Sequence, residues 1–209
     1  MIILIMNKFF KIKTEVIDLD EFLDFWERVY DNFNLEIRDS EYYDKNIQME
    51  KGILHILNAH NIRQLFYWKN GKKLSKSKEI IVDKVTEKLK DINDFRLKKE
   101  VNWDDYEQFY TDVVLKCTQG IIWGPFIVHI SNPLSFPIID QHVVRAHYFI
   151  SEGKIINILP INKNISHIYR EYTEFFNSLE RKTEKSRRII DKALWAFGKY
   201  LKGFRFLFE

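Results

Sequence analysis

Residues that interrupt regular secondary structure are scarce in this chain. Only seven glycines and four prolines are spread over 209 residues. A fold of many short strands needs frequent turn residues, so this scarcity disfavours such a fold and favours long helices. The chain is 45% hydrophobic, with 17 Phe, 10 Tyr and 5 Trp, which is ample for a buried core and excludes a disordered chain. Its length suits one ordinary domain or two small lobes that share a core.

Apolar residues recur at helical spacing along most of the chain. Asn102 and Asp140 stand where helix N-caps are expected, and Gly71 and Gly153 stand where helices should end. The apolar residues 1–10 are interpreted instead as a buried strand or arm. The pattern predicts an all-α fold with helices over residues 18–32, 47–59, 62–69, 75–89, 102–118, 125–130, 140–150, 163–179 and 183–202.

A single cysteine, Cys117, limits both the chemistry and the compartment. One thiol forms no internal disulfide, and it excludes a zinc or iron–sulfur site built from cysteines. The apolar stretch from Met1 to Phe10 is too short to cross a bilayer, and no small-residue cleavage site follows it. We therefore expect a cytoplasmic protein with no membrane partner.

Charge is distributed unevenly along the chain. Residues 61–100 hold 12 Lys and Arg against 6 Asp and Glu, and residues 151–209 hold 12 against 7. Residues 1–60 and 101–150 are net acidic. Two basic segments around a mildly acidic middle suit a polyanionic partner such as a nucleic acid. Lysine-rich helices whose charges are simply solvated give the same pattern, so both interpretations stay open.

One apolar segment, residues 120–150, contains an isolated carboxylate. Between Cys117 and Phe149 the only formally charged residues are Asp140 and Arg145. A lone carboxylate in apolar surroundings is costly to desolvate unless something compensates for it. Either Asp140 caps the following helix by accepting backbone N–H bonds, or it faces a cleft and performs chemistry. The two interpretations are compatible, because a helix N-terminus favours the ionised carboxylate.

This segment resembles the hairpin and catalytic-aspartate region of the helix-hairpin-helix DNA glycosylase superfamily. It is most similar to the branch that includes 8-oxoguanine glycosylases. Members carry a glycine-containing hairpin, a helix, an apolar approach of the FP-V-D type and then D-x-x-V-x-R. The matching residues here are Gly120, Gly124, Phe136, Pro137, Asp140, Val143 and Arg145. Residues 191–199 are weakly similar to the terminal helix of such enzymes.

The resemblance implies a fold and a set of site residues. The fold is an all-α structure with the active-site cleft between two lobes, residues 1–100 plus the C-terminal helix and residues 101–180. Asp140 is the implied catalytic residue. Gln141 and His142, which follow it, are implied to lie near the flipped nucleotide. Trp68, Trp123 and Trp195 are added to the predicted base pocket because aromatic side chains can stack on a flipped base. The residues expected to contact the DNA backbone are Gly120, Gly124, Arg145, Lys69, Lys72 and Lys73.

Each of these assignments has a structural alternative. The tryptophans are also suited to the core, and the two glycines to a tight turn. Arg145 is expected to support Asp140 or to reach a phosphate, with a surface ion pair as the alternative. His129 and His147 lie on apolar helices and are interpreted as core residues whose ring nitrogens are hydrogen-bonded.

The segment departs from the family pattern at two places. The usual L-P-G-V-G hairpin is replaced by residues 119–124, QGIIWG. Lyase-competent members carry a lysine at the start of the next helix, but this chain has no lysine between Lys116 and Lys154. A Schiff base needs a nearby amine, so lyase activity is not expected, and Lys116 is interpreted as a charge at a helix C-terminus.

The expected activity is therefore that of a monofunctional DNA glycosylase. Such an enzyme flips a damaged or hypermodified base out of double-stranded DNA and excises it with no metal or cofactor, in repair or in defence against phage with modified DNA. We expect it to act as a monomer. The alternative is a non-catalytic DNA-binding module of the same fold. A metal-dependent nuclease is disfavoured, because no dense carboxylate cluster is evident.

Overall fold

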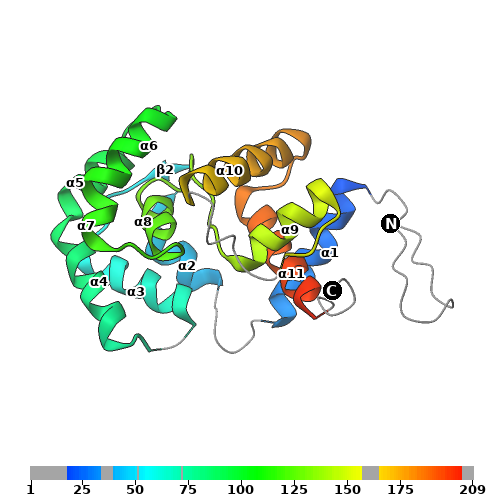
Figure 1. Cartoon of the computed structure of the whole chain (residues 1–209), viewed down its shortest axis with the longest axis horizontal. Coiled ribbons are helices and arrows are strands. Elements are labelled where there is room, and N and C mark those ends of the chain that lie inside the picture. Colours follow the sequence, from blue (N-terminus) through cyan, green and yellow to red (C-terminus); the bar gives the residue numbers. More distant parts are fainter. Residues whose placement is uncertain (1–17, 34–39, 51, 72, 157–164, 204–209) are drawn as a thin grey trace, which may run out of the picture. The chain divides into compact units, whose positions relative to one another are not determined.

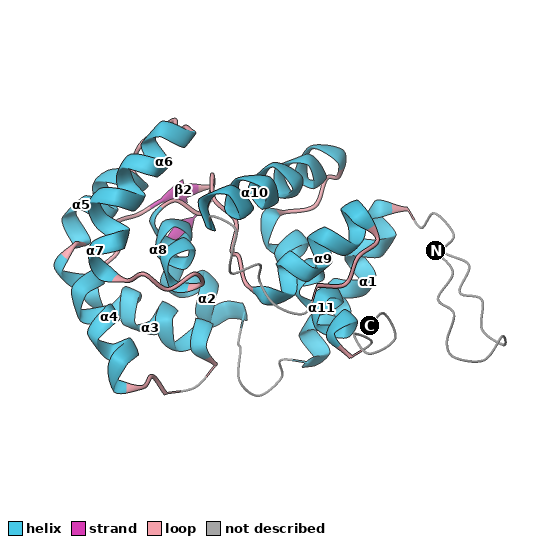
Figure 2. Cartoon of the chain, in the orientation of Figure 1, coloured by secondary structure: helices cyan, strands magenta, loops and turns pink. Residues whose placement is uncertain are grey.

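The computed structural model describes residues 18–33, 40–50, 52–71, 73–156 and 165–203. The described chain is almost entirely helical and contains one very short β-hairpin (Figure 2). The predicted all-α class is therefore confirmed. The expected arm at residues 1–10 lies outside the described residues. No helix in the described ranges is both long and apolar enough to cross a membrane.

The chain divides into two compact units. One consists of Met1–Phe33 and Ile139–Glu209, and the other of Asn34–Ile138. These boundaries differ from the expected lobes, which placed residues 34–100 and 101–138 apart. Residues of those two segments share one core, in which Phe95 stacks on Phe109 with ring centroids 4.1 Å apart and on Phe136 at 6.1 Å.

The first unit is built around its C-terminal helix. Helix α11 (Arg187–Lys202) packs between α1 (Leu19–Phe33) and α9 (Gln141–Glu152), and α10 (Ile165–Lys182) contacts both α9 and α11 (Figure 1). Most residues of α11 are buried, including a continuous run from Ile190 to Gly198. Charges at the edge of this packing are paired, as where Lys185 Nζ lies 2.6 Å from the Asp24 carboxylate.

A glycine sets the distance between α9 and α11. A Cβ atom built on Gly198 would lie 1.9 Å from the His142 carbonyl oxygen. Real Cβ contacts are essentially never shorter than 3.0 Å, so only glycine fits this helix crossing. Because His142 lies at the start of α9, this crossing also fixes where the N-terminus of α9 meets α11.

The second unit holds the remaining helices and the hairpin. Their order along the chain is α2 (Ser40–Ile47), β1 (Met49–Glu50), β2 (Ile53–Leu54), α3 (Ala59–Asn70), α4 (Lys76–Glu87), α5 (Leu89–Arg96), α6 (Trp103–Phe109), a π-helix η1 (Tyr110–Val114), α7 (Leu115–Cys117) and α8 (Trp123–Ser131). The predicted helix over 102–118 is thus continuous but contains a π-helical turn, a feature often found near functional sites.

Local capping explains several of these boundaries. Asn102 and Asp105 form a capping box at the start of α6, as the sequence predicted for Asn102. Gly71 ends α3 with φ +66° and Gly153 ends α9 with φ +69°, a left-handed conformation that favours glycine. Ser75 precedes α4 but its hydroxyl makes no cap hydrogen bond.

The predicted helix over residues 47–59 is wrong. The structure has an antiparallel hairpin there, with Met49 opposite Leu54, followed by a loop up to α3. The reason is a buried guanidinium from α5. Arg96 is 1% exposed and donates to the backbone carbonyls of His55 at 2.6 Å, of Gln48 at 3.3 Å and of Ile47. Carbonyls that bind Arg96 in this way are held out of a helical ladder, and Gly52 permits the turn with φ +77°.

Candidate functional site

Asp140 is the N-cap of α9. Its Oδ1 accepts hydrogen bonds from the backbone N–H groups of His142 at 2.7 Å and of Val143 at 3.2 Å. The side chain is partly exposed. The capping interpretation is therefore confirmed. Charge-assisted bonds from two amides and the helix dipole both favour the ionised carboxylate, which is the form a charge-stabilising role requires.

His142 and Trp195 lie beside this cap. The His142 ring stands edge-on to Trp195, with centroids 5.2 Å apart and planes at 66°. His142 is partly buried, and Gln141, the first residue of α9, is exposed. Three predicted base-pocket residues, Gln141, His142 and Trp195, therefore lie in the same unit as the predicted catalytic residue, Asp140. Trp195 is only 8% exposed, however, so little of its ring is available to a base.

Two lysines that the sequence did not single out complete the surroundings of His142. Lys199 Nζ lies 4.7 Å from the Trp195 ring centroid. Burial lowers the pKa of His142 to about 4; Asp140 opposes this shift, while the positive charges of Arg145, Lys202 and Lys199 add to it. Lys199 lies four residues after Trp195, one turn further along α11. This spacing is the sequence signal from which its position beside Trp195 could have been predicted.

The position of Arg145 differs from the expectation. The residue is 2% exposed, so its guanidinium is not at a surface where it can reach a DNA phosphate. Its Nε donates to the Ile156 carbonyl and its Nη1 to the Gly198 carbonyl, each at 3.0 Å. These internal bonds tie α9 to α11 and to the segment after α9, which makes Arg145 an internal anchor rather than a phosphate contact.

A buried phenol lies in the field of the same carboxylate. Tyr172 on α10 is fully buried, and its hydroxyl has no hydrogen-bond partner among the described residues. Burial raises its pKa well above the usual value, and the negative charges of Asp191 and then Asp140 add to the effect. The phenol is therefore neutral, and its O–H remains a donor close to acidic groups.

The other two predicted pocket tryptophans belong to the second unit and are engaged there. Trp68 is 6% exposed and packs on Tyr43, with centroids 4.6 Å apart, so it is a core residue. Trp123 stacks on Phe66 at 5.0 Å with planes only 7° apart, and Lys78 Nζ lies over the ring at 5.3 Å. A base would have to displace Lys78 to stack on Trp123. The core alternative is correct for Trp68, and Trp123 offers no free face.

The hairpin glycines serve the turn and its packing. The Gly124 amide donates to the Gly120 carbonyl at 2.9 Å, and the Gly120 amide donates to Thr118 Oγ1 at 3.0 Å. Both amides are thus used internally and are not available to a phosphate. A Cβ on Gly124 would lie 2.6 Å from the Tyr110 hydroxyl, so close packing accounts for that glycine.

The lysines predicted to contact the DNA backbone show no common arrangement. Lys69 Nζ lies over the Phe126 ring at 5.8 Å from its centroid, and Lys73 is exposed. Lys72 lies outside the described residues. The two histidines interpreted as core residues also differ from each other. His129 is 4% exposed and bonds the Tyr43 hydroxyl at 2.5 Å and the Phe136 carbonyl at 2.7 Å, as expected, whereas His147 Nδ1 has no partner among the described residues.

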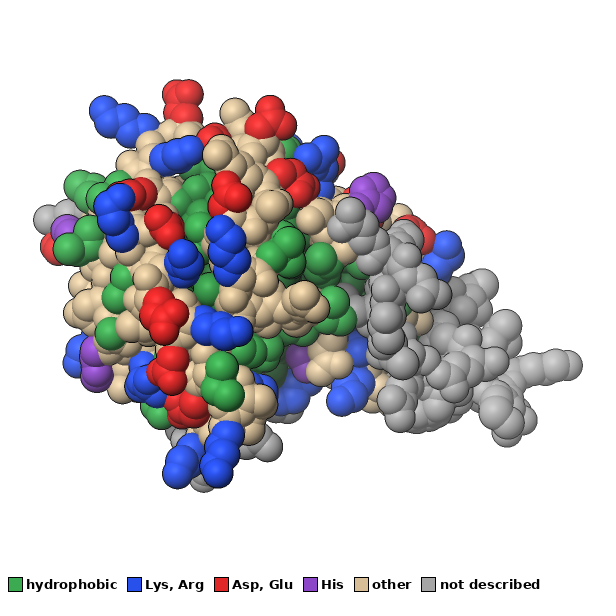
Figure 3. Space-filling view, turned by 60° about the vertical axis from the view of Figure 1, so that its left-hand side comes forward, with side chains coloured by type: hydrophobic (Ala, Val, Ile, Leu, Met, Phe, Trp, Pro, Cys, Tyr) green, Lys and Arg blue, Asp and Glu red, His purple; other side chains and the backbone are tan. Residues whose placement is uncertain are grey.

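The excess positive charge of residues 61–100 is partly neutralised by neighbouring carboxylates. Arg63 bonds Glu79 and, at 2.9 Å, Asp83, and Lys98 Nζ lies 2.7 Å from Asp105. On the face drawn in Figure 3, basic and acidic side chains intermingle and neither sign forms a continuous patch. The excess of positive charge in residues 61–100 therefore does not form a continuous basic patch on this face.

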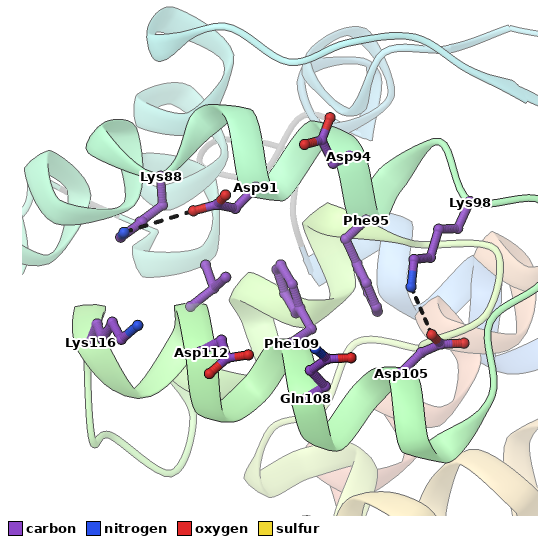
Figure 4. Close-up of a pocket in the computed structure, with 11 residues that line it drawn as sticks. Lys88, Asp91, Asp94, Phe95, Lys98, Asp105, Gln108, Phe109, Asp112 and Lys116 are labelled. Carbon is purple, nitrogen blue, oxygen red and sulfur yellow. Dashed lines mark hydrogen bonds and ion pairs between the residues drawn. The ribbon is translucent and has the colours of Figure 1, made fainter.

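The second unit also contains an open groove of about 400 Å³ between α5 and the α6–η1–α7 rod (Figure 4). Phe95, Phe109 and Val113 form its apolar floor, and both rims carry aspartates and lysines. Lys116 lies at one end, near Asp112. Most of the rim charges are paired with each other, and the groove contains none of the residues predicted for the base pocket.

No group of three or more potential metal ligands is found in the described part of the chain. Comparison of the chain with protein-family models, with curated proteins and with solved structures finds no match in any of the three.

Proposed function

We propose that this protein is a monofunctional DNA N-glycosylase of the helix-hairpin-helix type, with Asp140 as its catalytic carboxylate. The observation that supports this most strongly is the setting of Asp140. A carboxylate held by two backbone amides stands beside a neutral histidine that packs on a tryptophan, with two lysines nearby. The lysines suit the negatively charged DNA backbone, and the carboxylate suits the positive charge that develops on the sugar.

The proposed reaction breaks the bond between a base and C1′ of its deoxyribose. The bonding electrons leave with the base, and the sugar becomes cationic. Asp140 stabilises this cation, and a water adds at C1′ and passes its proton to the carboxylate. The released base carries the electron pair and takes up a proton from solvent. No lyase step is included, since the proposal assigns no amine to attack C1′.

Double-stranded DNA carrying a damaged or hypermodified base is the proposed substrate. The target nucleotide has to rotate out of the duplex, because an enzyme cannot reach C1′ while the base is stacked in the helix. Lys199 and Lys202 are suited to hold its phosphates, and Gln141 and His142 to contact its base or sugar. We expect the protein to act as a monomer.

The direct experiment incubates the protein with duplexes that carry oxidised, alkylated, deaminated, mismatched or phage-type modified bases, and identifies released bases by mass spectrometry. The matched control is Asp140→Asn. Asparagine is as good an N-cap as aspartate, so the variant should keep α9 intact while losing the charge. Release of a base by the wild type and not by the variant supports the proposal. Normal release by the variant contradicts it.

The second candidate is a non-catalytic DNA-binding module. The low exposure of Trp195 and the engaged faces of Trp68 and Trp123 favour it, because none of these three predicted tryptophans has an open face on which a flipped base could stack. DNA binding without formation of abasic sites on every duplex of the panel would identify the module rather than the enzyme.

A further inference from the structure

Arg145 is fixed by backbone groups on two sides. Its Nε donates to the Ile156 carbonyl and its Nη1 to the Gly198 carbonyl, both at 3.0 Å, and the side chain is 2% exposed. Both acceptors are backbone atoms of the same unit, so the guanidinium has little freedom to move. A planar group with fixed N–H directions imposes that geometry on whatever else it contacts.

The same guanidinium contacts the histidine beside the proposed catalytic carboxylate. Arg145 Nη1 lies 3.3 Å from His142 Nδ1. A guanidinium has five N–H donors and no acceptor, so in this pair Nδ1 has to present its lone pair. A neutral imidazole with a lone pair on Nδ1 carries its proton on Nε2.

Other charges around His142 act in the same direction. Lys199 and Lys202 of α11 and Arg145 of α9 disfavour an imidazolium, as does burial, and Asp140 is the opposing group. The ring is further held edge-on against Trp195. His142 is therefore a neutral ring with one orientation.

The remaining nitrogen, Nε2, is bonded to no atom of the described residues, and His142 is partly exposed. Nδ1 faces Arg145, so Nε2 is the ring nitrogen left for a ligand. At this position the site offers an N–H donor and no acceptor.

We propose that Arg145 is a positioning residue that locks His142 as the Nε2–H tautomer, so that position 142 recognises a hydrogen-bond acceptor on bound DNA. The identity of the ligand rests on the proposed function; the tautomer does not. The acceptor is an oxygen or nitrogen of the flipped nucleotide, in its base or in its backbone. A nucleotide that presents an amino group at this point is disfavoured, because two donors then face each other.

The tautomer is measured on the unmodified protein by nitrogen-15 NMR of the imidazoles. The chain has six histidines, and His142→Gln identifies the signals of position 142. We expect Nε2 to be protonated and Nδ1 to be unprotonated at neutral pH. A protonated Nδ1, or rapid averaging between both tautomers, would overturn the proposal. Arg145→Lys is expected to restore averaging; if this variant does not fold, the wild-type spectrum alone decides.

The ligand is tested by DNA affinity in an Asp140→Asn background. The probe is a duplex with one tetrahydrofuran abasic analogue, compared with the same duplex carrying an intact modified base. His142→Phe keeps a ring but has no donor and should lose about tenfold in affinity, whereas His142→Gln keeps an N–H donor and should retain most of it. A loss on both probes places the acceptor in the backbone, and a loss only with the base present places it in the base.

Equal affinity of the wild-type, phenylalanine and glutamine forms for both probes would overturn the ligand assignment. These outcomes are separate from those of the proposed function. A protein that releases no base from any duplex refutes the glycosylase, but it leaves the Nε2–H tautomer and the binding difference standing. If the protein is a glycosylase but Nδ1 of His142 is protonated, only the proposed tautomer is refuted.

Discussion

Replacing Gly198 by alanine should force α9 and α11 apart and destabilise the unit that carries Asp140. The new Cβ would lie 1.9 Å from the His142 carbonyl oxygen, whereas ordinary contacts begin near 3.4 Å. The two helices would therefore have to separate locally by about 1.5 Å, the difference between those two distances. The obstacle is backbone, so no side-chain rotation relieves it.

The cost can be assembled from three effects. Overpacking of this kind costs about 1–3 kcal/mol. The separation also stretches the bond from Arg145 Nη1 to the Gly198 carbonyl, which removes about 1–2 kcal/mol. Alanine is better than glycine inside a helix and returns about 1 kcal/mol. We expect a net loss of about 3 kcal/mol in the free energy of unfolding.

The assay is equilibrium unfolding in urea, followed by circular dichroism and by tryptophan fluorescence. The matched control is Gly203→Ala at the C-cap of the same helix, where the nearest atom to the new Cβ is 3.3 Å away and φ is −67°. The control should change stability by less than about 0.5 kcal/mol. If Gly198→Ala unfolds at the same urea concentration as the wild type and with the same slope, the close crossing of α9 and α11 is refuted.

Three further changes test other parts of the structure. The pKa of His142 lies near 4 in the folded protein, below its usual 6.5, so the unfolded chain takes up the proton first and stability falls as the pH drops from 6.5 towards 4. The loss in the free energy of unfolding is ~2 kcal/mol by pH 5. Urea titrations at several pH values should show that this loss is missing in His142→Gln. Arg96→Met removes a buried donor to several carbonyls and should cost about 2–4 kcal/mol; an unchanged melting temperature would contradict the anchoring of the hairpin. Gly124→Ala should destabilise, and adding Tyr110→Phe, which removes the hydroxyl 2.6 Å from the new Cβ, should restore part of the loss; equal stability of the single and double variants would disprove that contact.

Features that depend on nearby residues were predictable from the sequence. The caps at Asn102 and Asp140 and the helix ends at Gly71 and Gly153 all occur where local chemistry placed them. Each involves groups within a few residues of one another, so the signal is contained in a short window. The all-α class followed from the same local patterns.

Features that depend on distant residues were not predictable. The hairpin at residues 49–54 replaces a predicted helix because Arg96, more than forty residues away, binds the carbonyls around it. The apolar spacing of residues 47–59 favoured a helix, but two of the apolar residues in this stretch, Ile53 and Ile56, are 64% and 65% exposed. Nothing in that window reveals the guanidinium.

The candidate site divides in the same way. Asp140, Gln141 and His142 are neighbours in sequence, and the structure keeps them together with Trp195. The contribution of Lys199 depends on how α11 crosses α9, which Gly198 sets through a tertiary contact. Composition made Trp68 a candidate for stacking, but its burial in the second unit was decided by packing.

The most direct test of the central claim is the rate at which a base is released in a single turnover, with enzyme in excess, by the wild type and by Asp140→Asn. The duplex is whichever member of the panel the wild type cleaves fastest, and DNA affinity is measured in parallel. The loss of one charge-stabilising group predicts a fall of at least about a hundredfold in rate with affinity nearly unchanged. Equal rates, or a wild type that releases no base from any duplex while it binds them, would contradict the assignment of Asp140 as a catalytic carboxylate.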